Sequence, residues 1–148
     1  MLNFDQTLFY NTYNRLLEEK SFREIFYEVF VPLLFDLGML WQTNAITPSH
    51  EHFLTMHIKQ KILVHIERLQ SLNPKPSDKT VVLFLPKNET HDLGLQFINY
   101  EILSYGFHSI FLGESITSKT AFPIEHDTGL PPNELKYSIP LLKAFAIS

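Results

Sequence analysis

The periodicity of the apolar residues changes near residue 80, and this change limits the possible folds more than any other feature of the chain. Up to residue 71, apolar side chains recur at intervals of three and four, which is typical of amphipathic helices. Residues 80–86 (TVVLFLP) then form a continuous apolar run of strand length. Such runs are typical of strands that are buried on both faces of a parallel sheet.

We therefore predict an α + α/β fold, in which a bundle of three to four helices is followed by a partial βαβ unit. Residues 71–78 (SLNPKPSD) contain two prolines among turn-forming residues, so they are typical of a linker between domains. The predicted parts are the helical bundle 1–71, the linker 72–79, the α/β unit 80–116 and an unassigned tail 117–148.

The first two helices have recognisable start signals. Asn3 or Asp5 can cap a first helix that runs to about Lys20. Residues 21–24 (SFRE) have the spacing of a capping box, in which the serine hydroxyl and the glutamate carboxylate each accept a backbone N–H at the helix start. The second helix contains Pro32. We expect a kink or a break there, because proline removes one hydrogen bond of the helix.

A third helix is predicted to begin near residues 47–49 and to end near Leu72, and an acidic residue interrupts its apolar face. Glu51 falls at the centre of that face and His52 lies at its edge. Either Glu51 sits in the first turn, where the helix dipole favours a carboxylate that closes a cap, or Glu51 and His52 face a cavity that receives a polar group. The apolar stripe consists of Leu54, Ile58, Ile62, Ile66 and Leu69.

A histidine metal site is not favoured, although four histidines occur in or near the third helix. They do not have the H-E-x-x-H spacing, and His57 points away from His52 and His65 on the helical wheel. The fourth is His50. Trp41, near the end of the second helix, is expected by default to lie in the core.

The second part has the order strand, helix, strand, which defines a βαβ unit. A polar loop 87–92 leads to a helix over 93–105, which Gly106 ends as its C′ residue. A second strand is predicted over 107–112, and Gly113 closes it. The expected apolar stripe of the helix consists of Leu95, Ile98, Ile102 and Tyr105. In such units, loops at the carboxyl ends of the strands carry the chemistry.

The loop 87–94 (KNETHDLG) carries the candidate site of this part. It lacks the G-x-G-x-x-G and Walker patterns and contains Glu89-x-His91-x-x-Gly94 instead. An exposed histidine there could bind a metal while Glu89 orients its other ring nitrogen, and Gly94 would let a bulky group approach the backbone. The alternative interpretation is a polar loop that happens to expose a histidine.

Composition excludes several classes of function. Hydrophobic residues make up 45% and the net charge is −4, which is typical of a globular protein and not of a disordered one. Acidic and basic side chains are divided equally between residues 1–71 and 72–148, so no basic region suggests nucleic-acid binding. The absence of cysteine excludes disulfides, thiol catalysis and iron–sulfur clusters. No signal peptide or membrane span is recognisable, and a cytoplasmic location is expected.

The two site patterns together resemble those of cobalamin-binding proteins. The pattern E-x-H-x-x-G after a buried strand is similar to the cobalamin-binding signature D/E-x-H-x-x-G. Upstream, Trp41 is followed ten and eleven residues later by Glu51 and His52, which resembles the helical bundle of cobalamin-dependent, MerR-type transcriptional regulators. The resemblance covers about residues 3–116 and implies a helical cap followed by the start of a Rossmann-like cobalamin-binding domain.

The resemblance also implies a role for each matching residue. His91 would be the lower axial ligand of cobalt, Glu89 would support its ring, and Gly94 would let the side chains of the corrin pass. The cofactor would be cobalamin, with adenosylcobalamin the first expectation and methylcobalamin an alternative. The residues that would face the upper ligand are Trp41, Glu51 and His52.

The chain also departs from these regulators. The DNA-binding winged-helix domain that precedes their bundle is not recognisable here, so we expect no direct binding of nucleic acid. The later elements of the cobalamin domain are not recognisable after Ser115, and the apolar surface this leaves predicts a homo-oligomer. Gln42 follows Trp41 where light-sensing members commonly carry histidine, which argues against photosensing.

Three functions are consistent with these patterns. The first is a cobalamin-binding sensory module of a transcriptional regulator, which is not an enzyme. The second is a corrinoid methyl-carrier subunit of a methyltransferase system, in which the cobalt shuttles a methyl group. The third is a truncated fragment that no longer binds the cofactor. The spacing of Trp41, Glu51 and His52 favours the regulator, because an adenosyl pocket is a sensing feature.

Overall fold

The computed structural model describes residues 3–43, 45–72, 80–87, 89 and 91–116. Its contacts divide the chain into two units, the first ending at residue 61 and the second beginning at residue 62. The division falls within one long helix, whereas the predicted helical bundle ends at residue 71. Most of the predicted linker and all of the predicted tail (residues 73–79 and 117–148) lie outside the described residues.

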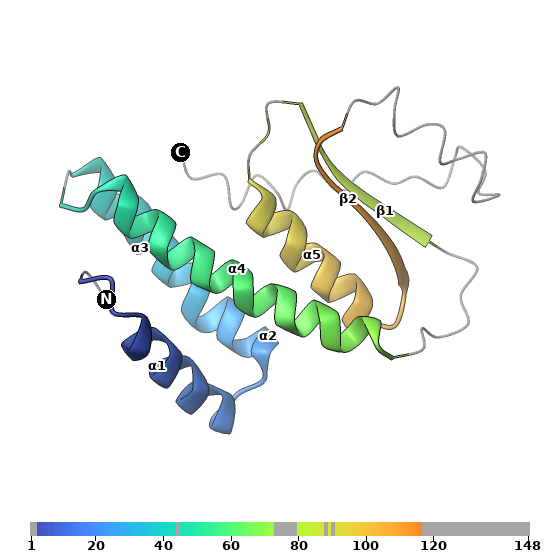
Figure 1. Ribbon diagram of the computed structural model, residues 1–148, viewed down its shortest axis with the longest axis horizontal. Helices are drawn as coiled ribbons and strands as arrows, with labels where there is room; N and C mark the ends of the chain where they lie inside the picture. Colours follow the sequence, from blue (N-terminus) through green and yellow to red (C-terminus); the bar gives the residue numbers. More distant parts are fainter. Residues whose placement is uncertain (1–2, 44, 73–79, 88, 90, 117–148) are drawn as a thin grey trace. The chain divides into compact units, whose positions relative to one another are not determined.

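The structure confirms the predicted fold class, which is mainly helical with a small βαβ unit (Figure 1). The first unit contains three helices, a short π-helix and the first half of a long helix. The second unit contains the rest of that long helix, two parallel strands and the helix that connects them. In chain order the elements are α1 (Gln6–Glu19), α2 (Phe22–Ile25), the π-helix η1 (Phe26–Phe30), α3 (Val31–Gln42), α4 (Pro48–Gln70), β1 (Thr80–Pro86), α5 (Asp92–Ser104) and β2 (His108–Ile116).

The start signals of the first two helices are confirmed. Asp5 caps α1, and its carboxylate accepts the backbone N–H of Leu8 at 2.8 Å. At the start of α2, the Ser21 hydroxyl oxygen accepts the backbone N–H of Glu24 at 3.3 Å. The Glu24 carboxylate accepts the backbone N–H of Ser21 at 2.8 Å, which completes the capping box. These bonds satisfy N–H groups that have no partner within the helices.

Pro32 does not break the second helix, because helical structure continues from α2 through η1 into α3. The disturbance takes the form of the π-helix directly before it, where the Val31 backbone N–H bonds to the Phe26 carbonyl, five residues earlier. Pro32 itself occupies the first turn of α3. The hydrogen bonds of the π-helix span five residues and not four, so the chain stays helical although Pro32 has no N–H to donate.

The core of the first unit is rich in aromatic residues. The ring of Phe30 lies nearly parallel to those of Phe9 and Tyr13, at centroid distances of 6.3 Å and 6.1 Å. Leu54 and Ile58, from the predicted apolar stripe of α4, are buried in the same unit. Aromatic rings and branched side chains of this kind each contribute roughly 1.5–3 kcal/mol when fully buried.

In the second unit, α5 packs against both strands of a two-stranded parallel sheet. The helix ends as predicted at Gly106, which has a φ of +82°. The Gly106 backbone N–H donates to the Leu103 carbonyl at 2.9 Å, and the Phe107 N–H donates to the Ile102 carbonyl at 3.2 Å. This pair of bonds is a Schellman motif, and it requires the positive φ that glycine adopts without strain.

Three details of the second unit contradict the predictions. The strand β2 continues past Gly113 to Ile116. A β-bulge shifts the pairing by one residue at this point, so that Gly113 (φ +83°) pairs with Phe84 and the strand continues. Only Leu85 of β1 is fully buried, and among the described residues α5 is the helix that packs on this strand. The apolar stripe of α5 is also different from the predicted one. Its buried residues are Gly94, Leu95, Gln96, Phe97, Asn99 and Tyr100.

Within the described residues, no helix combines the length and the apolar character that a membrane span needs.

We expect Ser21→Ala to lower the free energy of unfolding by about 1 kcal/mol, because it removes the cap of α2. Urea titration followed by circular dichroism measures this change. Ser104→Ala is the matched control, since the Ser104 hydroxyl donates to the Glu101 carbonyl inside α5 and caps no helix start. A loss in Ser104→Ala as large as that in Ser21→Ala would contradict the assignment.

The stabilisation by the capping box should also depend on pH. The Ser21 hydroxyl and backbone N–H both donate to Glu24 and lower the pKa of its carboxyl group. A carboxyl group whose pKa is lower in the folded chain stabilises the fold above its unfolded pKa, and this contribution is lost as the pH falls through the folded pKa. The difference between the wild type and Ser21→Ala should therefore be present at neutral pH and shrink in acid.

Candidate functional site

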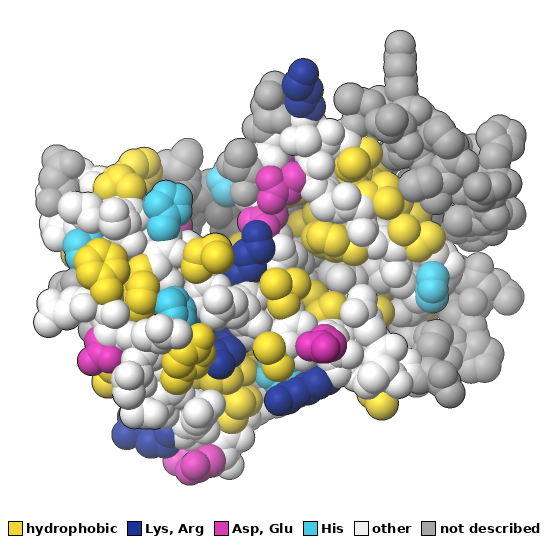
Figure 2. Space-filling model, in the orientation of Figure 1, with side chains coloured by type: hydrophobic (Ala, Val, Ile, Leu, Met, Phe, Trp, Pro, Cys, Tyr) yellow, Lys and Arg dark blue, Asp and Glu magenta, His cyan; other side chains and the backbone are white. Residues whose placement is uncertain are grey.

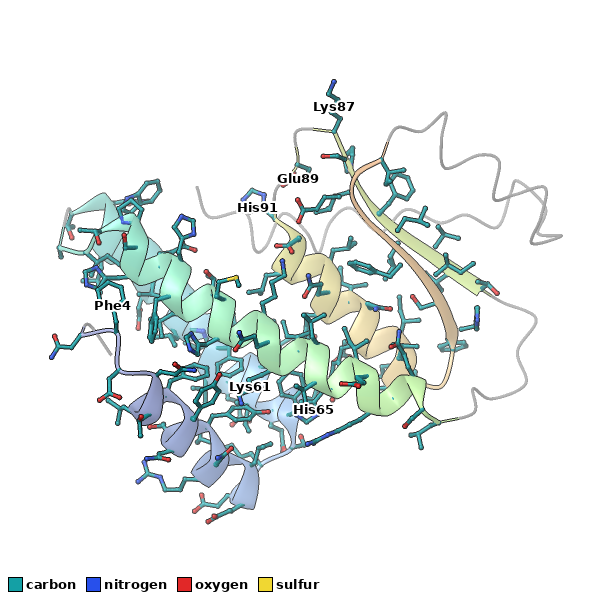
Figure 3. All side chains as sticks on the ribbon, viewed as in Figure 1. Phe4, Lys61, His65, Lys87, Glu89 and His91 are labelled. Carbon is teal, nitrogen blue, oxygen red and sulfur yellow. The ribbon has the colours of Figure 1, made fainter. Side chains whose placement is uncertain are left out.

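The loop between β1 and α5 places Glu89 and His91 at the carboxyl end of β1 (Figure 3). The Glu89 backbone N–H donates to the Pro86 carbonyl at 3.1 Å, which turns the chain directly after the strand. His91 is the N-cap residue of α5, with a φ of −81° and a ψ of 55°. The strand end and the helix start therefore hold both side chains in a short, defined connection.

Glu89 binds His91 through both its ring and its backbone. A Glu89 carboxylate oxygen, Oε1, accepts the backbone N–H of His91 at 3.1 Å and lies within hydrogen-bonding distance of the ring Nδ1. A carboxylate accepts and does not donate, so Nδ1 carries a proton and Nε2 of the neutral ring keeps its lone pair. Both side chains are 38% exposed. This is the arrangement that histidine ligands of metals usually have.

The structure therefore contains the hydrogen bond that the sequence predicted, while the role of His91 as a ligand remains a prediction. Gly94 is buried in the first turn of α5. Asp92, also in that turn, accepts a hydrogen bond from the Gln96 side-chain amide at 3.0 Å. The first turn of α5 is thus buried at Gly94 and hydrogen-bonded to the next turn, so the loop joins an ordered part of the helix.

Trp41 is not the core tryptophan that the sequence favoured by default, because 49% of its surface is exposed. It is the penultimate residue of α3, one turn beyond Leu37, the last fully buried residue of that helix. Its indole therefore extends past the packed part of the helix. Figure 2 shows hydrophobic side chains and histidines interspersed on the visible face of the helical part.

Glu51 and His52 lie in the first turn of α4, as the first of the two explanations requires. The Glu51 side chain is 40% exposed and that of His52 is 76% exposed. Glu51 Oε2 lies 3.6 Å from His52 Nδ1. The acceptor for the Thr47 backbone N–H is Nδ1 of His50 and not Glu51. The carboxylate is therefore in the favourable field of the helix dipole, but it is not the group that closes this cap.

Three polar residues have environments that were not predicted from the sequence. His50 caps α4, and its signal was the T-x-x-H spacing, which is that of a capping box with histidine in the last position. Gln96 and Asn99 are buried on α5, and their side-chain oxygens have no hydrogen-bond partner among the described residues. No periodic signal distinguishes these amides from exposed polar residues of the same helix.

The candidate residues fall into two groups, each within its own unit. Trp41, Glu51 and His52 belong to the first unit, and Glu89 and His91 belong to the second. In the part of the chain that the structure describes, no three His, Asp or Glu side chains are placed to hold a metal ion together.

Comparison with known families gives one match. Residues 1–64 match the family model of the B12 binding domain. The match supports a cobalamin-binding domain and includes Trp41, Glu51 and His52. It ends before Glu89 and His91, so a site in that loop is supported by its geometry and not by the family match. Comparisons with curated proteins and with solved structures found no match.

We expect Glu89→Ala to change the tautomer of His91, because the acceptor that holds the proton on Nδ1 is lost. Long-range ¹H–¹⁵N NMR of the imidazole at pH 8 should show the Nδ1–H form in the wild type and a larger fraction of the Nε2–H form in the variant. Glu114→Ala, at an exposed position of β2, should leave the spectrum unchanged. Identical His91 spectra in the wild type and Glu89→Ala would contradict the hydrogen bond.

Proposed function

We propose that this chain is the cobalamin-binding sensory module of a transcriptional regulator and is not itself an enzyme. The observation that carries the proposal is the hydrogen bond from His91 Nδ1 to Glu89, in a chain whose first 64 residues match the B12 binding domain. This bond leaves Nε2 with a lone pair at a partly exposed position. We further propose a cytoplasmic, homo-oligomeric protein whose assembly responds to the cofactor.

The donor set of the loop fits cobalamin. The cofactor supplies a cobalt whose corrin ring provides four nitrogens, so that a single imidazole suffices as the lower axial ligand. His91 would provide that nitrogen, and Glu89 would hold the ring in one tautomer and orientation. Gly94 adds no side chain to the first turn of α5. A carboxylate behind a ligating imidazole also raises its basicity, which strengthens it as a ligand.

The first unit supplies the reasons to prefer an adenosyl upper ligand. The exposed indole of Trp41 offers an aromatic surface for a nucleobase, and the carboxylate of Glu51 can accept hydrogen bonds from ribose hydroxyls or an amino group. A methyl group offers neither kind of contact. This difference supports the sensory module over the methyl carrier, which would need no such polar groups.

We expect purified chain to bind adenosylcobalamin in the dark with the absorption spectrum of the base-off, histidine-ligated form. His91→Ala should lose this spectrum, because no other imidazole occupies the loop after β1. His108→Ala, an exposed histidine of the same unit, is the matched control and should retain it. A wild-type mixture with the spectrum of the free cofactor would overturn the proposal.

The choice between regulator and carrier can be tested at Glu51. We expect Glu51→Ala to weaken adenosylcobalamin binding by about tenfold or more, the size of a lost hydrogen bond to a charged group, with little effect on methylcobalamin. Equilibrium titration followed by absorbance measures both affinities. Glu67→Ala, an exposed acidic position of the same helix, is the control. Equal losses of affinity for both cofactors would mean that Glu51 only stabilises the start of α4 and does not contact the adenosyl group.

A further inference from the structure

We propose that His50 is a positioning residue, which fixes the first turn of α4 and with it the side chains of Glu51 and His52. The inference rests on the proposed function, because it concerns residues that would contact the upper ligand. Two independent features carry it. One is the hydrogen bonding of the His50 ring to Thr47, and the other is the unusual conformation of Phe4, whose ring covers His50.

The His50 ring closes the start of α4. Its Nδ1 accepts the backbone N–H of Thr47 at 3.1 Å and lies 2.8 Å from the Thr47 hydroxyl. The His50 backbone N–H in turn donates to the Thr47 carbonyl at 3.0 Å. Because a backbone N–H can only donate, Nδ1 is unprotonated, and in the neutral ring the proton is on Nε2. The imidazole thus does what a glutamate or glutamine does in a capping box.

Phe4 holds the other side of this imidazole. Its ring (labelled in Figure 3) stacks on His50 at a centroid distance of 4.7 Å and an interplanar angle of 15°. It also packs against Phe53 in a T-shaped arrangement, with the two ring centroids 5.5 Å apart. Phe4 directly precedes Asp5, the N-cap of α1. An apolar residue at this position commonly packs on the fourth residue of its own helix, which is Phe9. Here the ring contacts α4 instead.

The backbone of Phe4 has an unusual conformation at this contact. Its φ is +56°, a left-handed conformation that bulky residues rarely adopt. Such strain persists only where the surrounding structure holds it, and it is concentrated at functional sites. Phe4 adopts this conformation where its ring stacks on His50, so the N-terminal segment and the start of α4 meet at one imidazole.

A histidine suits this cap better than a glutamate would. Glu51 is the acidic residue of the first turn of α4, and a second carboxylate at position 50 would place two negative charges side by side. The neutral imidazole accepts the Thr47 N–H without adding charge. The carboxylate of Glu51 therefore remains available for hydrogen-bond donors of a ligand, while its backbone is held by the neighbouring residue.

The test compares His50→Ala with His50→Gln, in which the amide oxygen can still accept the Thr47 N–H. We expect His50→Ala to raise amide hydrogen exchange at Thr47 and to weaken adenosylcobalamin binding, each about five- to tenfold, the scale of a lost helix cap. Methylcobalamin affinity should change little. His50→Gln should restore the protection of Thr47 and most of the adenosylcobalamin affinity. His65→Ala, on the same helix, is the control.

The outcomes separate this inference from the proposed function. Unchanged exchange at Thr47 in His50→Ala would overturn the inference alone. So would equal losses with both cofactors, or a His50→Gln chain that behaves like His50→Ala, because a general loss of stability would explain either result. A wild-type chain that binds no cobalamin would overturn the proposed function, and the positioning role with it. Loss in His50→Ala with rescue in His50→Gln supports the inference.

Discussion

The apolar stripe of α4 is the constraint that the two units share, because it contributes buried side chains to each of them. Leu54 and Ile58 are buried in the first unit, and Ile62 and Ile66 are buried in the second. At roughly 1.5–3 kcal/mol for each fully buried side chain, these four residues alone contribute an amount comparable to the net stability of a small domain. Because the stripe repeats every four residues on one continuous helix, a change of register in α4 would expose buried apolar side chains in the part of it that belongs to each unit.

Features of the fold that depend on neighbouring residues in the sequence could be predicted. The caps at Asp5 and Ser21 and the Schellman motif at Gly106 need only a few consecutive residues, so the required bonds are determined locally. The stripe of α4 is predictable for a related reason, since its period is that of the helix itself. The hydrogen bond between Glu89 and His91 belongs to this group, because both residues lie in one tight loop.

Features that depend on packing against other elements could not be predicted in the same way. The apolar periodicity of α5 favoured Ile98 and Tyr105, yet the structure buries Phe97 and Asn99, because packing against other elements and not periodicity decides which residues are covered. Trp41 looked like a core residue by size and composition, but no periodic signal shows where the packed part of α3 ends. A disturbance of the helix at Pro32 could be predicted from the sequence. The π-helix before it could not, because its formation depends on how Phe26 and Phe30 pack in the core.

The orientation of the His91 side chain, the candidate cobalt ligand, depends on α5 more than on the loop. Glu89 accepts from the backbone of His91 as well as from its ring, so the plane of the imidazole is tied to the N-cap residue of the helix. The helix in turn is anchored by Phe97, which has no exposed surface, and is terminated by the motif at Gly106. A side chain held on a packed helix keeps its orientation better than one on a free loop. Through the short connection from β1 to α5, the packing of the βαβ unit therefore sets the direction in which the lone pair of His91 Nε2 points.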